Sequence, residues 1–560
     1  MTDHRRRAYA TADTIAAALV EGGVARVIIS PGSRSTPLVL AVSDSGPPTE
    51  VVLDERSAGF TALGSARATG EPAAMVCTSG SAAANYLPAV VEADRGRVPL
   101  VVVTADRPPG FLDRDAPQTI NQIGLYGSAV RASANLAVAH ECDREWVAGE
   151  VLRVLGAAYP PNAGPVHLNV PFDKPLEPPE RLDTGPSLEM SLPESGGKRV
   201  LGPSVKTLEG FMDRADNGVI VVGPRQTGQA EREAVYRLAA LAGWPILADG
   251  MSGLRSRASE NLVTTGDVLV GDRSSALQTP DAVIRVGGMP TGTITQNWLE
   301  GLRAPEVVLD PDFRWTAAGP EAVLRDPIAP LLERASPSPL DGAWTGAWRS
   351  AELGGRERRR YERTHHPDTE LALTADVLDN EALVWVGSSM PVRHVNAMLE
   401  PGCGAAVFGN RGACGIDGAL ASAAGAALGL GRRVTALVGD LTFLHDAGSL
   451  AAARSLGVDL SIVVLDNRGG AIFEMLPYLR SLRESGAEAA YQQARELFVT
   501  PHDHDLVAVA GGFGVTAERI EPANLVEALR GARSRPGVSV LVVETDPEAM
   551  FAAYHRLYRT

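Results

Sequence analysis

Short runs of apolar and β-branched residues alternate with longer segments of helical periodicity along most of the chain, and Gly, Pro or polar residues follow each run. This alternation predicts buried strands separated by helices, which is the pattern of βαβ units and a parallel sheet. The runs of the first block lie at residues 24–30, 51–53, 73–78, 100–104 and 166–170.

The same alternation returns in two further blocks. Their expected strands lie at residues 218–223, 282–287 and 306–310, and then at 382–387, 434–439, 460–465 and 538–544. Polar, Pro-rich segments separate the blocks at 175–200 and 335–368, and we interpret both as linkers. The prediction is an α/β chain of three doubly wound parallel-sheet domains, at residues 1–185, 195–340 and 365–560.

The composition of the chain argues against several classes of protein function. The chain has 560 residues, 45% of them hydrophobic, which is enough apolar material for several cores. Its net charge of -15 argues against nucleic acids or anionic membranes as general partners, because both need a basic face. The four cysteines lack the spacing of a zinc ribbon, and no segment resembles a signal peptide or a membrane span. We expect a cytoplasmic protein without stable membrane insertion.

Two polar residues follow predicted strands of the third block. Asp440 comes directly after the strand at 434–439, and Asn467 follows the strand at 460–465, 27 positions later. That spacing matches one strand–helix–strand crossover, so both side chains should emerge at the carboxyl edge of neighbouring parallel strands. A carboxylate, an amide oxygen and a loop carbonyl suit a magnesium ion that also holds a diphosphate. Either turn alone is common in proteins without a site, and only the pair at this spacing favours one.

Five motifs carry a resemblance to a known family. The pair in the third block resembles the signature of thiamin-diphosphate enzymes, with Leu441 and Asp466 in place of a glycine and an asparagine of the generic pattern. The five motifs are Ser30-Pro-Gly-Ser-Arg-Ser-Thr-Pro37, Leu53-Asp-Glu-Arg-Ser57, Thr104-Ala-Asp-Arg-Pro-Pro109, Asn410-Arg-Gly-Ala-Cys-Gly-Ile-Asp-Gly418 and Gly439-Asp-Leu-Thr-Phe-Leu-His-Asp446. These motifs resemble those of the MenD family, the 2-succinyl-5-enolpyruvyl-6-hydroxy-3-cyclohexene-1-carboxylate synthases of the menaquinone pathway. They occur in the same order as in that family, and the resemblance covers essentially the whole chain.

The resemblance implies a fold and a reaction. It implies a pyrimidine-binding first domain, a central domain and a diphosphate-binding third domain, assembled as a homodimer or homotetramer with active sites between subunits. The implied cofactors are thiamin diphosphate and Mg²⁺, with Mn²⁺ as an alternative metal. The implied reaction is decarboxylation of 2-oxoglutarate, followed by 1,4-addition of the succinyl carbanion to isochorismate.

The resemblance also implies roles for individual residues. Glu55 matches the catalytic glutamate that protonates the pyrimidine ring of the cofactor. Metal binding is implied for Asp440, Asn467 and the carbonyl of Gly469. The remaining positions contact the cofactor or the substrate carboxylates, for which arginine offers a bidentate fork. The implied cofactor contacts are Glu55, Ser389, Ile416, Asp440, Leu441, Thr442 and Asn467, and the implied substrate contacts are Ser33, Arg34, Arg107, Gln118, Ser389, Arg393 and Arg411.

One departure concerns the central domain. Some members of the family carry a Lys-Arg pair there that reaches a substrate carboxylate. Thr293 and Ile294 occupy those positions in this chain, and neither carries a charge. Either Arg285 or another arginine takes over this contact, or the donor binds more weakly.

Other polar clusters have simpler interpretations. His365 and His366 lie in the second expected linker. The segment His502-Asp-His-Asp505 resembles a metal motif, but it lies at a predicted helix start, where carboxylates serve as caps. The lone Gly223-Pro-Arg turn is a weak indication of a nucleotide site.

Two other functions remain open. One is another thiamin-diphosphate 2-oxo-acid decarboxylase or an acetolactate-synthase-like enzyme, whose donor pyruvate needs no arginine for a distal carboxylate. The other is a dinucleotide-binding or non-catalytic regulatory α/β protein, in which Glu55 and the Asp440/Asn467 pair would have no role. Donor choice tests the first, and stabilisation by NAD rather than by thiamin diphosphate with Mg²⁺ tests the second.

Overall fold

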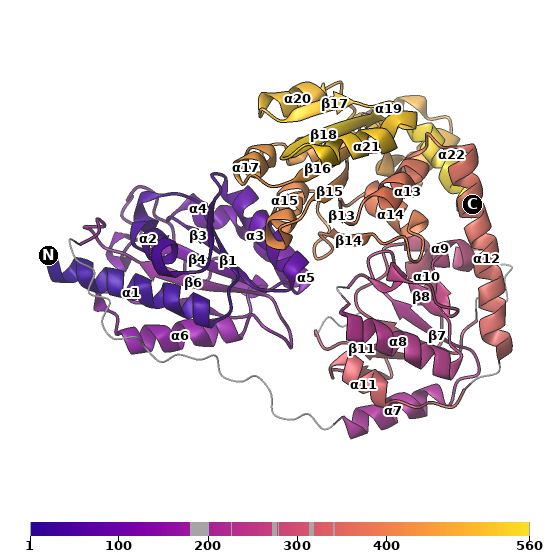
Figure 1. Ribbon diagram of the computed structural model, residues 1–560, viewed down its shortest axis with the longest axis horizontal. Coiled ribbons are helices and arrows are strands. Elements are labelled where there is room, and N and C mark those ends of the chain that lie inside the picture. The colour runs from indigo at the N-terminus through magenta and orange to yellow at the C-terminus, as the bar shows by residue number, and fades with distance from the viewer. Residues whose placement is uncertain are drawn as a thin grey trace.

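Three six-stranded sheets of parallel strands organise the chain into three lobes (Figure 1). The computed structural model describes residues 2–179, 201–225, 227–271, 277, 279–312, 319–339 and 342–558. Helices cover both faces of each sheet, so the predicted α/β fold with three doubly wound parallel sheets is confirmed. Within these residues, no helix is long and apolar enough to cross a membrane.

In the first lobe the strand order is β2-β1-β3-β4-β6-β5. Helices α1, α2 and α6 bury one face of this sheet, and α3, α4 and α5 bury the other. The strands are β1 (Arg26–Ile29), β2 (Thr49–Val51), β3 (Ala73–Cys77), β4 (Leu100–Asp106), β5 (Ser133–Asn135) and β6 (Pro165–Pro171). The helices are α1 (Thr2–Glu21), α2 (Thr36–Ser45), α3 (Glu55–Thr69), α4 (Ser81–Asn85), α5 (Leu87–Gly96) and α6 (Arg144–Gly156).

In the central lobe the strand order is β12-β11-β10-β7-β8-β9. Helices α7, α8 and α11 bury one face, and α9, α10 and α12 bury the other. The strands are β7 (Gly218–Val222), β8 (Ile246–Ala248), β9 (Leu262–Val263), β10 (Ala282–Val286), β11 (Glu306–Leu309) and β12 (Ala322–Leu324). The helices are α7 (Gly202–Met212), α8 (Gln229–Ala242), α9 (Gly266–Gly271), α10 (Thr293–Gly301), α11 (Ile328–Arg334) and α12 (Gly342–His365).

In the third lobe the strand order is β14-β13-β15-β16-β18-β17. Helices α15, α17 and α20 bury one face, and α13, α14 and α21 bury the other. The strands are β13 (Leu383–Val386), β14 (Ala406–Gly409), β15 (Val434–Gly439), β16 (Leu460–Asp466), β17 (Thr516–Arg519) and β18 (Val538–Glu544). The helices are α13 (Glu370–Asn380), α14 (Met390–Met398), α15 (Ala419–Leu430), α16 (Asp440–His445), α17 (Ser449–Ser455), α18 (Pro477–Glu484), α19 (Glu488–Phe498), α20 (Leu506–Gly512), α21 (Leu525–Ser534) and α22 (Pro547–Tyr558).

The apolar runs predicted most inner strands and missed most edge strands. Strands β5, β9, β12, β14 and β17 all lie at sheet edges, and none of them was expected. They have only two to four residues, and most are incompletely buried because an edge strand has a neighbour on one side only. The inner strand β8 was also missed, since three buried residues are too short a run to stand out from their surroundings.

One expected linker contains a long helix. The segment 335–368 includes α12, whose 24 residues run from the central lobe to the third lobe (Figure 1). Trp348 packs in the core of the central lobe, the buried Glu352 accepts hydrogen bonds from the loop after β9, and Glu362 pairs with an arginine of α22. The linker interpretation of α12, whose last residue is His365, is therefore wrong. In the sequence this amphipathic helix resembles a solvated segment, because several of its polar side chains are buried and paired in the fold.

The other expected linker, 175–200, lies largely outside the described residues, which stop at 179 and resume at 201. Each sheet has its strands within one of the expected domain intervals. The exact domain bounds at 1–185, 195–340 and 365–560 stay predictions.

Helices α3 and α15 lie side by side and join the first and third lobes (Figure 1). Glycines allow this close approach: a Cβ at Gly64 would lie 2.0 Å from the backbone oxygen of Ser422, and a Cβ at Gly425 would lie 2.0 Å from a carbonyl of α3. A side chain at either position would push the helices apart. This contact also relates the start of α3, where Glu55 lies, to the loop before α15, which contains Ile416.

We expect Gly64→Ala to lower the free energy of unfolding by roughly 1–3 kcal/mol, because the added methyl group meets backbone that cannot move away easily. Gly149→Ala in α6 is the matched control, since a Cβ there meets no atom within 4 Å and this variant should be neutral or slightly stabilised. Urea unfolding followed by circular dichroism measures both. Wild-type stability of Gly64→Ala would show that the two helices separate without cost.

Candidate functional site

Asp440 and Asn467 lie at the carboxyl ends of neighbouring strands, as their spacing predicted. Strands β15 and β16 pair in parallel; Asp440 follows β15 as the first residue of α16, and Asn467 follows β16. The N–H of Gly469 donates to Asp440 Oδ2 at 2.7 Å, and the N–H of Leu441 donates to Asp440 Oδ1 at 2.6 Å. Thr442, two positions after Asp440 in α16, is also buried. Strand pairing therefore brings the predicted metal ligands to one edge of the sheet.

The Asp440 carboxylate is 2% exposed and lies among other titratable groups. Burial raises its pKa to about 7, and the charges of Asp466 and Glu370 add to this effect, against two backbone N–H donors. His502 Nε2 lies 3.2 Å from Asp440 Oδ2, and ligand atoms of Asp440, Asp466 and His502 all lie within 4.8 Å of one another. Burying two neighbouring carboxylates costs free energy unless a positive charge lies beside them. This cluster therefore suits a divalent cation.

Asn467 fits a metal ligand because of how its amide is oriented. Its Nδ2 donates to Glu370 Oε1 at 2.8 Å, whereas its buried Oδ1 has no hydrogen-bond partner among the described residues. A buried oxygen without a partner is unusual, and a cation would satisfy it. Gly469 has φ +153°, and a Cβ there would lie 2.8 Å from the carbonyl oxygen of Val499. The residues present therefore fit a magnesium or manganese ion.

Ser389 and Arg393 lie at the start of α14. Ser389 precedes the helix with φ +69°, a conformation that is uncommon for a residue with a side chain and frequent at functional sites. Arg393 Nη1 donates to the Ser389 carbonyl at 2.6 Å. Burial lowers the pKa of Arg393, and the positive charge of Arg411 adds to this effect. Two arginines that repel each other in this way favour an anion beside them.

Glu55 is the first residue of α3, at the carboxyl edge of the first sheet. Strand β2 ends shortly before it, and Asp54 caps the helix by accepting the N–H of Arg56. Glu55 is half-buried, whereas the side chains of Val51 and Leu53 are 58% and 82% exposed. Among the large apolar side chains that the structure describes, Leu53 is the most exposed.

Arg34 and Arg107 come together at the same edge of the first sheet, after β1 and β4. Arg34 Nη1 donates to the Phe172 carbonyl at 2.7 Å, and Arg107 Nη1 donates to the Gln118 carbonyl at 2.8 Å. Burial lowers the pKa of Arg34, and the charge of Arg107 lowers it further. Gln118 and Ser33 are exposed next to these arginines. The arrangement is suited to binding a carboxylate.

The loop that carries Arg411 and Ile416 is held by a buried acid of the first lobe. Glu92 in α5 is 3% exposed and accepts the N–H of Gly412 at 2.7 Å and the N–H of Ala413 at 2.6 Å. Ile416 itself is only half-buried, so part of its apolar side chain faces outward from the protein. Contacts between two lobes of one chain therefore determine where this loop lies.

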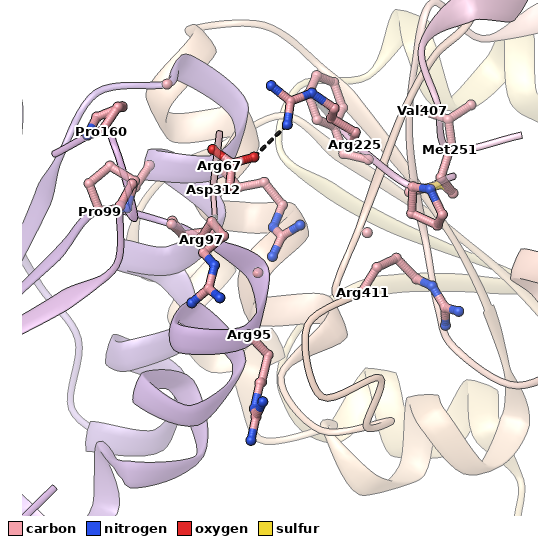
Figure 2. Close-up of a pocket in the computed structure, with 18 of the residues that line it drawn as sticks. Arg67, Arg95, Arg97, Pro99, Pro160, Arg225, Met251, Asp312, Val407 and Arg411 are labelled. Atoms are coloured by element: carbon pink, nitrogen blue, oxygen red, sulfur yellow. Dashed lines mark hydrogen bonds and ion pairs between the residues drawn. The ribbon is translucent and has the colours of Figure 1, made fainter. Parts of the chain in front are cut away.

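Arg411 also lines a cavity of about 230 Å³ between the three lobes (Figure 2). Arg225 of the central lobe also lines it and pairs with Asp312. The first lobe contributes three more arginines, Arg67, Arg95 and Arg97. Among the described residues that line this cavity, Arg411 is the one predicted substrate contact. The other predicted substrate contacts lie outside it.

Helix α10 begins at the two positions where some members of the family that this chain resembles carry a Lys-Arg pair. Thr293 and Ile294 are its first residues, and Ile294 packs in the apolar cluster on one face of the central sheet. Arg285 is 4% exposed, and its Nη1 lies 3.7 Å from Glu306 Oε2. Arg285 is therefore engaged inside the lobe, which leaves another arginine or a weaker donor site as the alternatives.

Three residues of the site had no prediction or a different one. Asp505 caps α20, as the sequence predicted for a carboxylate of this segment. His502 has no part in this cap, and its side chain lies against Asp440. Glu92 and Glu370 had no prediction at all. An acid that will be buried resembles a surface acid until its partners from distant segments are known. The metal-like spacing of the histidines at 502 and 504 was the one signal in the sequence.

Comparisons with known proteins agree with this geometry. The family described as "Thiamine pyrophosphate enzyme, N-terminal TPP binding domain" matches residues 10–125, and "Thiamine pyrophosphate enzyme, C-terminal TPP binding domain" matches residues 388–543. Proteins named 2-succinyl-5-enolpyruvyl-6-hydroxy-3-cyclohexene-1-carboxylate synthase from Halorubrum lacusprofundi, Chloroflexus aurantiacus and Geobacillus kaustophilus are 34%, 37% and 37% identical to the chain. The alignments cover 96%, 89% and 97% of this chain and 95%, 86% and 96% of those proteins.

Proposed function

The chain belongs to the family of 2-succinyl-5-enolpyruvyl-6-hydroxy-3-cyclohexene-1-carboxylate synthases, and we propose that it catalyses the reaction of that name in menaquinone biosynthesis. It is a thiamin-diphosphate-dependent transferase. From 2-oxoglutarate and isochorismate it forms 2-succinyl-5-enolpyruvyl-6-hydroxy-3-cyclohexene-1-carboxylate and CO2. The observation that carries this proposal is the buried edge with Asp440 and Asn467, where one amide oxygen lacks a partner within the described part of the chain.

The third lobe holds the diphosphate end of the cofactor in this proposal. Thiamin diphosphate supplies a nucleophilic carbon and an electron sink for the loss of CO2 from a 2-oxo acid. Asp440, Asn467 Oδ1 and the Gly469 carbonyl would hold Mg²⁺ or Mn²⁺, whose positive charge would offset the buried carboxylate and the diphosphate. Ile416 supports the rings of the cofactor through its apolar side chain. The remaining proposed cofactor contacts are Ser389, Leu441 and Thr442.

The first lobe supplies the catalytic acid. Glu55 holds a proton at the pyrimidine nitrogen of the cofactor, a task for which a half-buried carboxylate is suited. The exposed Val51 and Leu53 beside it support a site that is completed by the third lobe of a second subunit. A homodimer or homotetramer with shared active sites is therefore part of the proposal.

Arginines bind the two dianionic substrates. Arg34 and Arg107 in the first lobe and Arg393 and Arg411 in the third lobe form two pairs. The charge of Arg107 contributes to the lowered pKa of Arg34, and the charge of Arg411 contributes to the lowered pKa of Arg393. Because the whole chain carries a charge of -15, attraction of the anions must come from such local groups. The polar contacts Ser33, Gln118 and Ser389 complete the proposed substrate site.

An assay with purified protein tests the proposal. With thiamin diphosphate and Mg²⁺ present, we expect 2-oxoglutarate and isochorismate to be consumed in equal amounts with release of CO2, and dialysis against a chelator should abolish the reaction. Mass spectrometry identifies the product. No consumption of 2-oxoglutarate in the presence of isochorismate would contradict the proposal, and turnover of pyruvate in its place would indicate an acetolactate-synthase-like enzyme.

A further inference from the structure

A single buried carboxylate connects the proposed metal site to the rest of the third lobe. Glu370, the first residue of α13, is 1% exposed. Its Oε1 accepts hydrogen bonds from Asn467 Nδ2 and from Thr545 Oγ1, both at 2.8 Å. Its Oε2 lies 2.7 Å from His394 Nε2. Segments at four different places in the sequence thus meet at one side chain.

Glu370 decides which end of the Asn467 amide is free. An asparagine side chain has a donor end and an acceptor end, and a cation binds only the oxygen. A carboxylate accepts hydrogen bonds and does not donate them, so the NH2 end of Asn467 is the end that Glu370 can hold. The Oδ1 end is then left buried without a hydrogen-bond partner among the described residues.

We propose that Glu370 is the positioning residue of the metal site, which turns the amide of Asn467 so that Oδ1, and not Nδ2, is presented to the cation. This inference rests on the proposed function, because it takes Asn467 to be a metal ligand. Partners that orient a metal ligand typically contribute about 10–100-fold to the affinity for the metal.

The same carboxylate links the metal ligand to the helix that carries a proposed substrate arginine. His394 is fully buried in α14, next to Arg393, and its Nδ1 lies 3.0 Å from the Tyr554 hydroxyl of α22. Through His394, Glu370 therefore fixes α14 relative to the turn that contains Asn467. A ligand whose own partners are packed in this way is held in its binding orientation before the metal arrives.

Glu370→Gln tests the proposal, because it keeps the size of the side chain but offers Asn467 a donor as well as an acceptor. Mn²⁺ is titrated into the protein with thiamin diphosphate present, and free Mn²⁺ is followed by electron paramagnetic resonance. We expect the affinity to fall roughly 10–100-fold. Thr545→Val is the matched control, since it removes a different hydrogen bond to the same Oε1, and it should bind Mn²⁺ nearly as the wild type does. Wild-type affinity in Glu370→Gln would overturn the proposal.

Exchanging the two functional groups separates orientation from general stability. Asn467→Asp places two carboxylates against each other and should bind Mn²⁺ weakly. Adding Glu370→Gln to that variant restores an N–H···O hydrogen bond in the opposite direction, so the double variant should bind Mn²⁺ about tenfold more tightly than Asn467→Asp alone. If Glu370→Gln weakens binding equally in both backgrounds, its effect is general destabilisation and the proposal fails.

The variant Asn467→Ala distinguishes a failure of this inference from a failure of the proposed function. If Asn467→Ala loses Mn²⁺ while Glu370→Gln keeps it, Asn467 is a ligand but Glu370 does not position it, and only the inference is overturned. If Asn467→Ala binds Mn²⁺ like the wild type, Asn467 is not a ligand. The metal site of the proposed function is then wrong, and the inference falls with it.

Discussion

Glu55→Gln should lower the rate of CO2 release from 2-oxoglutarate by about 10²–10⁴-fold, the usual contribution of a positioned proton donor. Glutamine has nearly the same size, but its amide cannot exchange a proton with the pyrimidine nitrogen of the cofactor. The proposed metal ligands lie in another lobe, so Mg²⁺-dependent binding of thiamin diphosphate should change little. Steady-state kinetics and calorimetric titration measure the two quantities on the same preparation.

Glu50→Gln is the matched control for this experiment. Glu50 lies in β2, five positions before Glu55, and its Oε1 is 3.4 Å from Arg26 Nη1 in a partly exposed ion pair. Such a pair contributes about 1 kcal/mol at most to stability, and turnover should remain at the wild-type level. If Glu55→Gln also keeps wild-type turnover, Glu55 is not the catalytic acid.

Asp440→Ala should abolish binding of the metal and the diphosphate together. The substitution removes the carboxylate that anchors the cation, and it also removes the acceptor of the N–H groups of Gly469 and Leu441 that shape the turn. Cofactor and Mg²⁺ at about 100 times their dissociation constant should stabilise the wild type by about 2.7 kcal/mol. The variant should gain nothing, which thermal unfolding with and without both ligands measures.

An exposed carboxylate nearby provides the comparison for Asp440→Ala. Asp503 belongs to the loop that brings His502 against Asp440, but its own side chain is exposed. Asp503→Ala should keep the full stabilisation by thiamin diphosphate and Mg²⁺. Equal stabilisation of Asp440→Ala and wild type would place the metal elsewhere.

The meeting of Asp440 and Asn467 at one sheet edge was predictable because it depends on the local order of strands and helices. Two apolar runs separated by one crossover form neighbouring parallel strands, so the residues after them meet whatever the rest of the chain does. Helix α12 was not predictable in this way, because Glu352 and Glu362 are charged residues whose partners lie in other segments. The same reason explains why Glu370 and Glu92 carried no prediction.

The sequence by itself determined the three α/β blocks, most of the inner strands and the loops that bear the motif residues, since strand and helix periodicity and turn residues act over short distances. Its resemblance to one family pointed to Glu55, the arginines and the proposed metal ligands. Only the tertiary structure decided which amide end of Asn467 is free, how Glu92 of the first lobe holds the loop of Arg411, and that Arg285 is already paired. These features depend on contacts between segments far apart in the chain, and such contacts exist only once packing has brought the segments together.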